Sequence, residues 1–69
     1  MNQDKRKLID AIIAHAEGER AKHVAQLDVM LSAPVMISGH TALFDAVEDE
    51  LEAIAIYSEQ IRTLTEIYA

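Results

Sequence analysis

The sequence contains no cysteine and no tryptophan, and aromatic residues make up only 4% of its 69 residues. Without cysteine the chain forms neither disulfides nor thiolate metal sites, so a small fold must be stabilised in another way. Few aromatic residues combined with many Ala, Ile and Leu favour packed helices over a β-sandwich or a barrel. Glycine occurs twice and proline once, which leaves room for long uninterrupted helices.

Positive charge and long apolar runs are also scarce. Six Lys and Arg residues stand against twelve Asp and Glu residues, giving a net charge of −6. Phosphate binding relies on Lys and Arg, so we expect no nucleic-acid partner and no anionic membrane partner. No apolar stretch approaches the roughly 18 residues of a membrane span. The apolar run after Lys7 is broken by Asp10 and His15, unlike a signal peptide. We therefore expect a cytoplasmic protein.

The sequence lacks the motifs that usually carry catalysis. It has no cysteine nucleophile and no Gly-rich phosphate loop. Its serines, Ser32, Ser38 and Ser58, have no His and Asp that can be placed beside them as a triad. A helical fold of this length also leaves little room for a pocket of enzyme size. We predict a non-enzymatic protein with no catalytic residue and no cofactor.

What the chain does have is two helical apolar patterns. The first predicts a helix over about residues 3–32, capped by Asn2 or Asp4 and ended by Pro34. Its apolar stripe, interrupted by polar side chains, consists of Ile9, Ile13, Ala16, Val24, Leu27 and Leu31. Gly18 lies inside this helix and marks either a bend or a place where another backbone comes close.

The second pattern predicts a helix over about residues 40–68. Its apolar residues recur at three- and four-residue steps and are Phe44, Val47, Leu51, Ile54, Tyr57, Ile61, Leu64 and Tyr68. Leu43, Ala46, Ala55 and Ile56 widen this stripe beyond what one partner helix covers. The second helix therefore requires at least two neighbours.

Two long helices joined by a short loop, residues 33–39, predict an antiparallel hairpin that forms one domain over residues 1–69. A lone hairpin leaves one side of its core open to water, so we expect an all-α homodimer that forms a four-helix bundle, or a higher homo-oligomer. The predicted dimer core consists of Ile9, Ile13, Ala16, Val24, Leu27, Leu31, Val47, Leu51, Ile54, Tyr57, Ile61 and Leu64.

One group of side chains has the spacing of a metal site. His15, Glu19 and His23 are four residues apart, so they project from one face of a helix, and imidazole with carboxylate suits zinc, iron or manganese. The alternative is a solvated Glu19–His23 pair beside a partly buried His15. The metal hypothesis predicts a helical bundle held together by a metal ion.

Two features suggest a protein partner. The loop contains the apolar residues Val35, Met36 and Ile37, which either plug the end of the core or form a docking patch. The second helix carries the whole net charge, and Glu48, Asp49 and Glu52 form either a solvated face or a contact for a basic partner. We predict a protein-binding adaptor or regulator, with the metal-binding bundle as the alternative and a nucleic-acid regulator ranked last.

Overall fold

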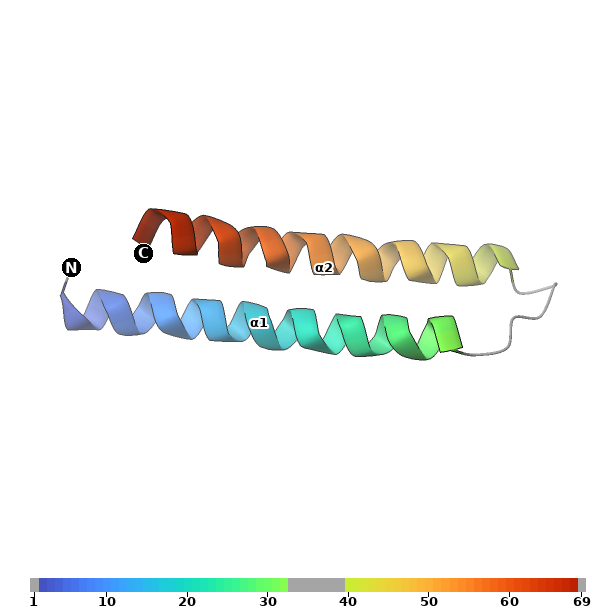
Figure 1. The fold of residues 1–69 in the computed structure, drawn as a ribbon, viewed down its shortest axis with the longest axis horizontal. Coiled ribbons are helices and arrows are strands. Elements are labelled where there is room, and N and C mark those ends of the chain that lie inside the picture. The colour runs from blue at the N-terminus through green and yellow to red at the C-terminus, as the bar shows by residue number, and fades with distance from the viewer. Residues whose placement is uncertain (1, 33–39, 69) are drawn as a thin grey trace.

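The computed structural model describes residues 2–32 and 40–68. It contains two α-helices, α1 (Gln3–Ser32) and α2 (His40–Tyr68). The helices run antiparallel and side by side along the length of the molecule, which extends 55 Å along its longest axis (Figure 1). The prediction of an all-helical hairpin is confirmed. The sequence predicts helices over about residues 3–32 and 40–68, and the observed helices are Gln3–Ser32 and His40–Tyr68.

Local chemistry accounts for both ends of α1. The Asn2 side-chain oxygen accepts a hydrogen bond from the Lys5 backbone N–H at 2.7 Å, which satisfies a donor that a helix start leaves unpaired. Asn2 rather than Asp4 is therefore the cap. At the other end the Ser32 hydroxyl donates to the Asp28 carbonyl at 2.7 Å. The helix stops there because Pro34 disfavours helical geometry at the residue before it.

The two helices meet along a regular row of positions, here called the seam. All seam side chains are buried or half-buried, and successive seam residues alternate between four- and three-residue steps, as in a heptad repeat. The α1 seam is Ile9, Ile13, Ala16, Arg20, His23, Leu27 and Met30. The α2 seam is Leu43, Val47, Glu50, Ile54, Tyr57, Ile61, Leu64 and Tyr68.

The seam corrects the predicted apolar stripes at four positions. The sequence pattern places Val24, Leu31, Phe44 and Leu51 on the stripes that meet, but all four are exposed in the hairpin. Each lies one residue past a seam position. The sequence pattern includes only apolar residues, whereas the actual row continues through polar ones.

Very little of the described chain is fully buried. Ile9 is 5% exposed and Ala16 is 0% exposed, and these two are its only buried apolar residues. A small residue at Ala16 lets the two helix backbones approach. Gly18 lies in an uninterrupted helix, and a Cβ added there would have no atom within 4 Å. Within the hairpin no other backbone therefore approaches Gly18, contrary to the prediction that another backbone comes close to it.

Neither helix of the described segments is long and apolar enough to cross a lipid bilayer.

Candidate functional site

A polar pair sits inside the seam in the half of the hairpin next to the loop. His23 Nδ1 lies 2.7 Å from Glu50 Oε2, and their side chains are only 20% and 12% exposed. An ionised carboxylate can only accept hydrogen bonds, so the Nδ1 atom carries the proton and donates. This pair is called the His23–Glu50 layer. The sequence places Glu50 in an acidic run and allows it to reach His15, Glu19 and His23 from across the bundle, and the structure brings it to His23.

Other side chains complete the hydrogen bonding of this layer. With its amide nitrogen turned toward α2, Gln26 donates to both carboxylate oxygens of Glu50, at 2.8 and 3.0 Å. The His23 ring stacks on Tyr57 with centroids 6.1 Å apart, and His15 meets the edge of the same Tyr57 ring at 6.5 Å. A partly buried, hydrogen-bonded pair favours one alignment of two helices, because a slipped alignment leaves it unpaired.

An ion pair borders the layer on α1. Lys22 Nζ lies 2.8 Å from Glu19 Oε2, and His23 Nε2 lies 3.9 Å from the same oxygen. The hydrogen bond from Lys22 lowers the pKa of the Glu19 carboxyl, and the same bond raises the pKa of the Lys22 ammonium. Both groups therefore remain charged and compensate each other beside the layer.

The predicted metal group His15, Glu19 and His23 is not brought together as a metal site. His15 packs against Tyr57, and His23 turns its Nδ1 atom to Glu50 on the other helix. Over residues 2–32 and 40–68, no three His, Asp or Glu side chains are arranged to hold a metal ion. The spacing is right for one helical face, but the neighbouring helix supplies the partners of both rings.

The outer face of α2 carries exposed carboxylates, including the predicted contact residues Glu48, Asp49 and Glu52. Residues 41–55 contain five acidic residues and no Lys or Arg. Acidic side chains therefore dominate the part of α2 next to the loop. The three loop candidates Val35, Met36 and Ile37 lie outside the described residues.

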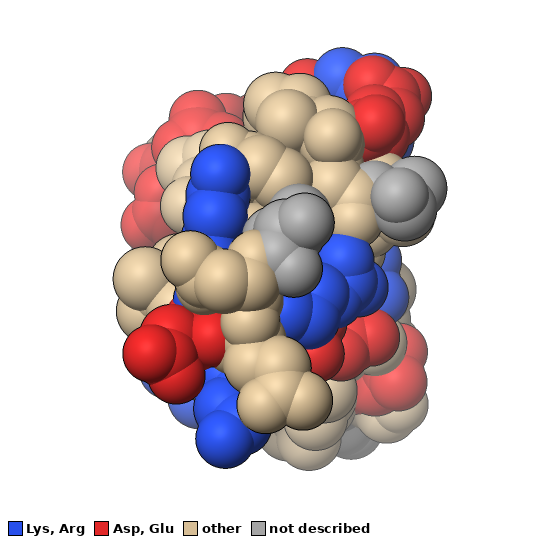
Figure 2. Space-filling view, turned by 90° about the vertical axis from the view of Figure 1, so that its left-hand side faces the viewer, with Lys and Arg blue, Asp and Glu red and all other residues tan. Residues whose placement is uncertain are grey.

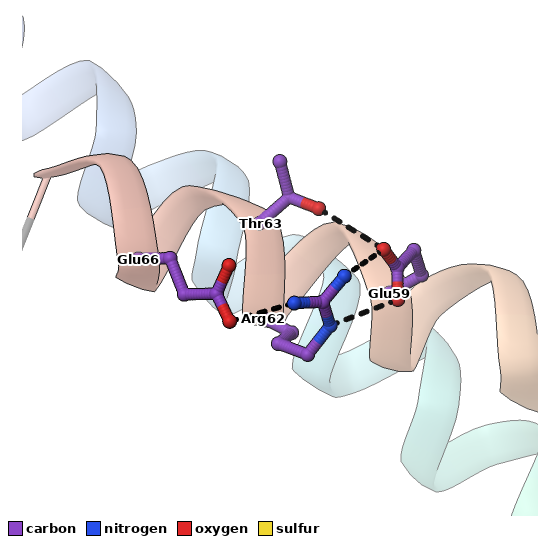
Figure 3. A network of polar contacts seen from close by, with 4 residues as sticks. All are labelled: Glu59, Arg62, Thr63 and Glu66. Carbon is purple, nitrogen blue, oxygen red and sulfur yellow. Dashed lines mark hydrogen bonds and ion pairs between the residues drawn. The ribbon is translucent and has the colours of Figure 1, made fainter.

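Near its C-terminal end α2 compensates its own charge. Arg62 bonds through its guanidinium to Glu59 on one side and to Glu66, at 2.6 Å, on the other, and Thr63 donates to Glu59 at 3.4 Å (Figure 3). The hydrogen bond from Arg62 lowers the pKa of the Glu59 carboxyl and raises the pKa of Arg62. This network lies on the exposed surface, where such pairs contribute little to stability.

At the end of the hairpin opposite the loop, basic side chains of α1 contact the last residue of α2. Arg6 donates to the Tyr68 carbonyl at 2.5 Å and pairs with Asp10 at 3.2 Å. Lys5 lies over the Tyr68 ring, 5.2 Å from its centroid. Figure 2 shows Lys and Arg side chains spread across this end, with acidic side chains beside them. A cation beside the last carbonyls of α2 is favourable, since those groups carry partial negative charge.

Among residues 2–32 and 41–68, nine large apolar residues are exposed, and they divide into two sets. Five directly precede a seam residue and are called the long face: Leu8, Ile12, Val29, Ile56 and Ile67. Four directly follow a seam residue and are called the loop-half patch: Val24, Leu31, Phe44 and Leu51. Positions before and after a seam residue flank it on opposite sides, so the two sets lie on opposite broad faces of the hairpin.

Two open hollows accompany the long face. The first is lined by Ile12, Glu59, Gln60, Thr63 and Leu64, and the second by Lys22, Ala25, Gln26, Val29, Met30 and Glu50. The first hollow brings Ile12 of α1 beside Gln60 and Thr63 of α2, all three of which precede a seam residue. Residues before the seam on both helices thus share one face.

Comparison of the chain with protein-family models, with curated proteins and with solved structures found no match.

Proposed function

We propose that this chain is a non-enzymatic protein-interaction module that works as a homodimer of hairpins, forming a four-helix bundle, with the acidic face of α2 left open to a basic protein partner. The observation that carries the proposal is the large apolar surface that one hairpin leaves in water. In the part of the chain whose burial is described, nine large apolar side chains are between 40% and 70% exposed.

The size of the exposed surface, as well as its apolar character, supports association. The chain has a mass of 7.7 kDa. A folded monomer of that mass is expected to expose about 4300 Å². This hairpin exposes 5154 Å². The difference is roughly 800 Å², the area that each partner buries in a protein interface of standard size. An elongated shape contributes to the excess, and the exposed apolar residues support the proposal that a second chain covers part of this surface.

The acidic face of α2 supports the second half of the proposal. Glu48, Asp49 and Glu52 are exposed and lie in a stretch without Lys or Arg. Complementary charge mainly speeds association and selects the partner. The contribution of loop residues 35–37 stays a prediction from the sequence.

Sedimentation equilibrium tests the homodimer. At micromolar concentration we expect a species of twice the chain mass, with a melting temperature that rises with protein concentration. Ile56→Glu places a charge on the apolar surface and should shift the mass to the monomer. Glu52→Gln, which also alters an exposed residue of α2, is the matched control and should leave the mass unchanged. A concentration-independent monomer would contradict the proposal.

A second experiment tests the acidic face once the dimer is established. A variant with Glu48, Asp49 and Glu52 changed to Gln should bind an Arg- and Lys-rich helical peptide at least tenfold more weakly than the natural chain in low salt. A variant with Asp10, Glu17 and Asp28 changed to Gln removes the same charge from α1 and is the control. Equal loss in both variants would indicate attraction by net charge alone, without a site.

A further inference from the structure

We infer that a second copy of this chain packs antiparallel on the long face, so that the loop end of each hairpin covers the opposite end of the other. The inference rests on the proposed homodimer and adds the face and the direction of packing. Two observations carry it: the extent of each apolar face and the distribution of charge along the hairpin.

The extent of the apolar faces selects the long face. It runs from Leu8 and Ile67 at the end away from the loop, through Ile56, to Val29 near the loop. The loop-half patch has no exposed large apolar residue before Val24 in α1 or after Leu51 in α2. Covering a face along its whole length requires apolar side chains at both ends, and only the long face has them.

The surface shape of the long face also suits a second pair of helices. Both hollows of the described structure that accompany it have largely apolar walls and open to solvent. Exposed side chains such as Val29 and Leu8 of a second copy can fill them, as knobs fill holes between helices. Glu19 and Lys22, an ion pair on this face, neutralise each other at 2.8 Å, and Asp49, which directly precedes the seam residue Glu50, is a further carboxylate there.

Charge selects the antiparallel direction. The α2 segment next to the loop, residues 41–55, carries five carboxylates and no Lys or Arg. The start of α1 carries Lys5, Arg6 and Lys7 against Asp4 alone. Parallel packing places both acidic segments at the same end of the assembly, which is repulsive, whereas antiparallel packing places each at the end that holds the basic start of the other chain.

Disulfide trapping tests both the face and the direction, because the natural chain contains no cysteine. A disulfide requires Cα atoms within roughly 7 Å. Ile56 lies near the middle of α2, so Ile56→Cys should form a covalent dimer with itself under mild oxidation. Leu51→Cys, also on α2 and similarly exposed but on the opposite face, should stay monomeric on a non-reducing gel.

Mixtures of two single-cysteine chains test the direction independently. Leu8→Cys mixed with Val29→Cys should give the mixed disulfide, because antiparallel packing brings these two ends of α1 together. A mixture of Leu8→Cys and Ile67→Cys should form little mixed disulfide. Parallel packing would instead make the disulfide between these two positions the favoured product. Circular dichroism of each reduced variant confirms that it has folded.

The outcomes separate this inference from the proposed function. A monomeric mass by sedimentation overturns both. A dimeric mass with trapping at Leu51, with trapping between Leu8 and Ile67, or with none of these disulfides, overturns the face or the direction and leaves the homodimer standing.

Discussion

The two halves of the hairpin hold together in different ways. The terminal half, residues 3–17 and 56–68, contains both buried apolar residues, Ile9 and Ala16, and its seam is apolar apart from the tyrosine hydroxyls. The loop half, residues 18–32 and 40–55, has no buried residue among those whose burial is described, and its seam includes Arg20, His23 and Glu50. Apolar burial therefore stabilises one half, and hydrogen bonding aligns the other.

This difference assigns separate roles to stability and specificity within one short chain. Apolar seams tolerate slippage by a heptad, because one large apolar side chain replaces another. The His23–Glu50 layer does not, because a slipped alignment leaves a carboxylate without its donor. We therefore expect the terminal half to supply the larger share of the free energy of folding, and the polar layer of the loop half to determine which residues face each other.

The largest expected effect comes from removing apolar burial in the terminal half. Ile9→Ala should lower the free energy of unfolding by about 2–4 kcal/mol, because it leaves a cavity at a nearly closed position. Leu27→Ala, at a half-buried seam position of the loop half, should cost about half as much, because solvent already reaches that side chain. Urea denaturation at equal protein concentration measures both. Equal losses would remove the contrast between the halves.

Breaking the polar layer should have the next largest effect. His23→Leu leaves the Glu50 carboxylate largely buried without its ring partner and should cost about 1–3 kcal/mol. Adding Glu50→Leu removes the unpaired charge, so the double variant should recover at least that loss. A double variant as unstable as the single one would show that the two side chains are not coupled. Chemical denaturation of both variants and the natural chain gives the comparison.

Gly18 offers a smaller, stabilising change in the loop half. Gly18→Ala should raise the free energy of unfolding by about 0.5–1 kcal/mol, because alanine favours the helix and meets no atom within 4 Å in the hairpin. Thermal melting at two protein concentrations measures it. Destabilisation that grows with dilution would instead place another chain against Gly18 in the assembly.

The smallest expected effects are local to the exposed ion pairs of each half. Arg62→Gln should raise the pKa of Glu59 toward its ordinary value of 4.5, and Lys22→Gln should do the same for Glu19. Because both carboxyl pKa values are lowered in the folded chain, these pairs stabilise it above pH 4.5 and stop doing so as the pH falls through the lowered values. Carboxyl chemical shifts followed by NMR against pH measure each value. An unchanged Glu59 titration in the Arg62 variant would contradict the network in Figure 3.

Local signals in the sequence were sufficient to predict the hairpin. Pro34 and Gly39 bracket the connection, and Asn2 has the side chain that a helix start needs. These features act over a few residues and depend little on what packs around them. The helix ends follow from them, and the all-helical class follows from the composition and the apolar periodicity.

The alignment of the seam could not be predicted in the same way. Glu50 and Leu51 are neighbours, and apolar character favours Leu51 as the inward residue. The structure places Glu50 inward because His23 and Gln26 on the facing helix supply its hydrogen bonds. That choice depends on two residues more than twenty positions away, so no pattern within α2 reveals it. The strict alternation of three- and four-residue steps through Arg20 and His23 was the available signal.

The antiparallel hairpin also has a consequence for how the chain folds. His23 and Glu50 are separated by 27 positions in the sequence, whereas Arg6 and Tyr68 are separated by 62. Closing the longer loop costs only about 0.7 kcal/mol more conformational entropy, but local contacts form sooner on average. We expect pairing to begin beside the loop and to advance toward the termini. The best-buried contacts then form last, and the polar layer sets the alignment before they close.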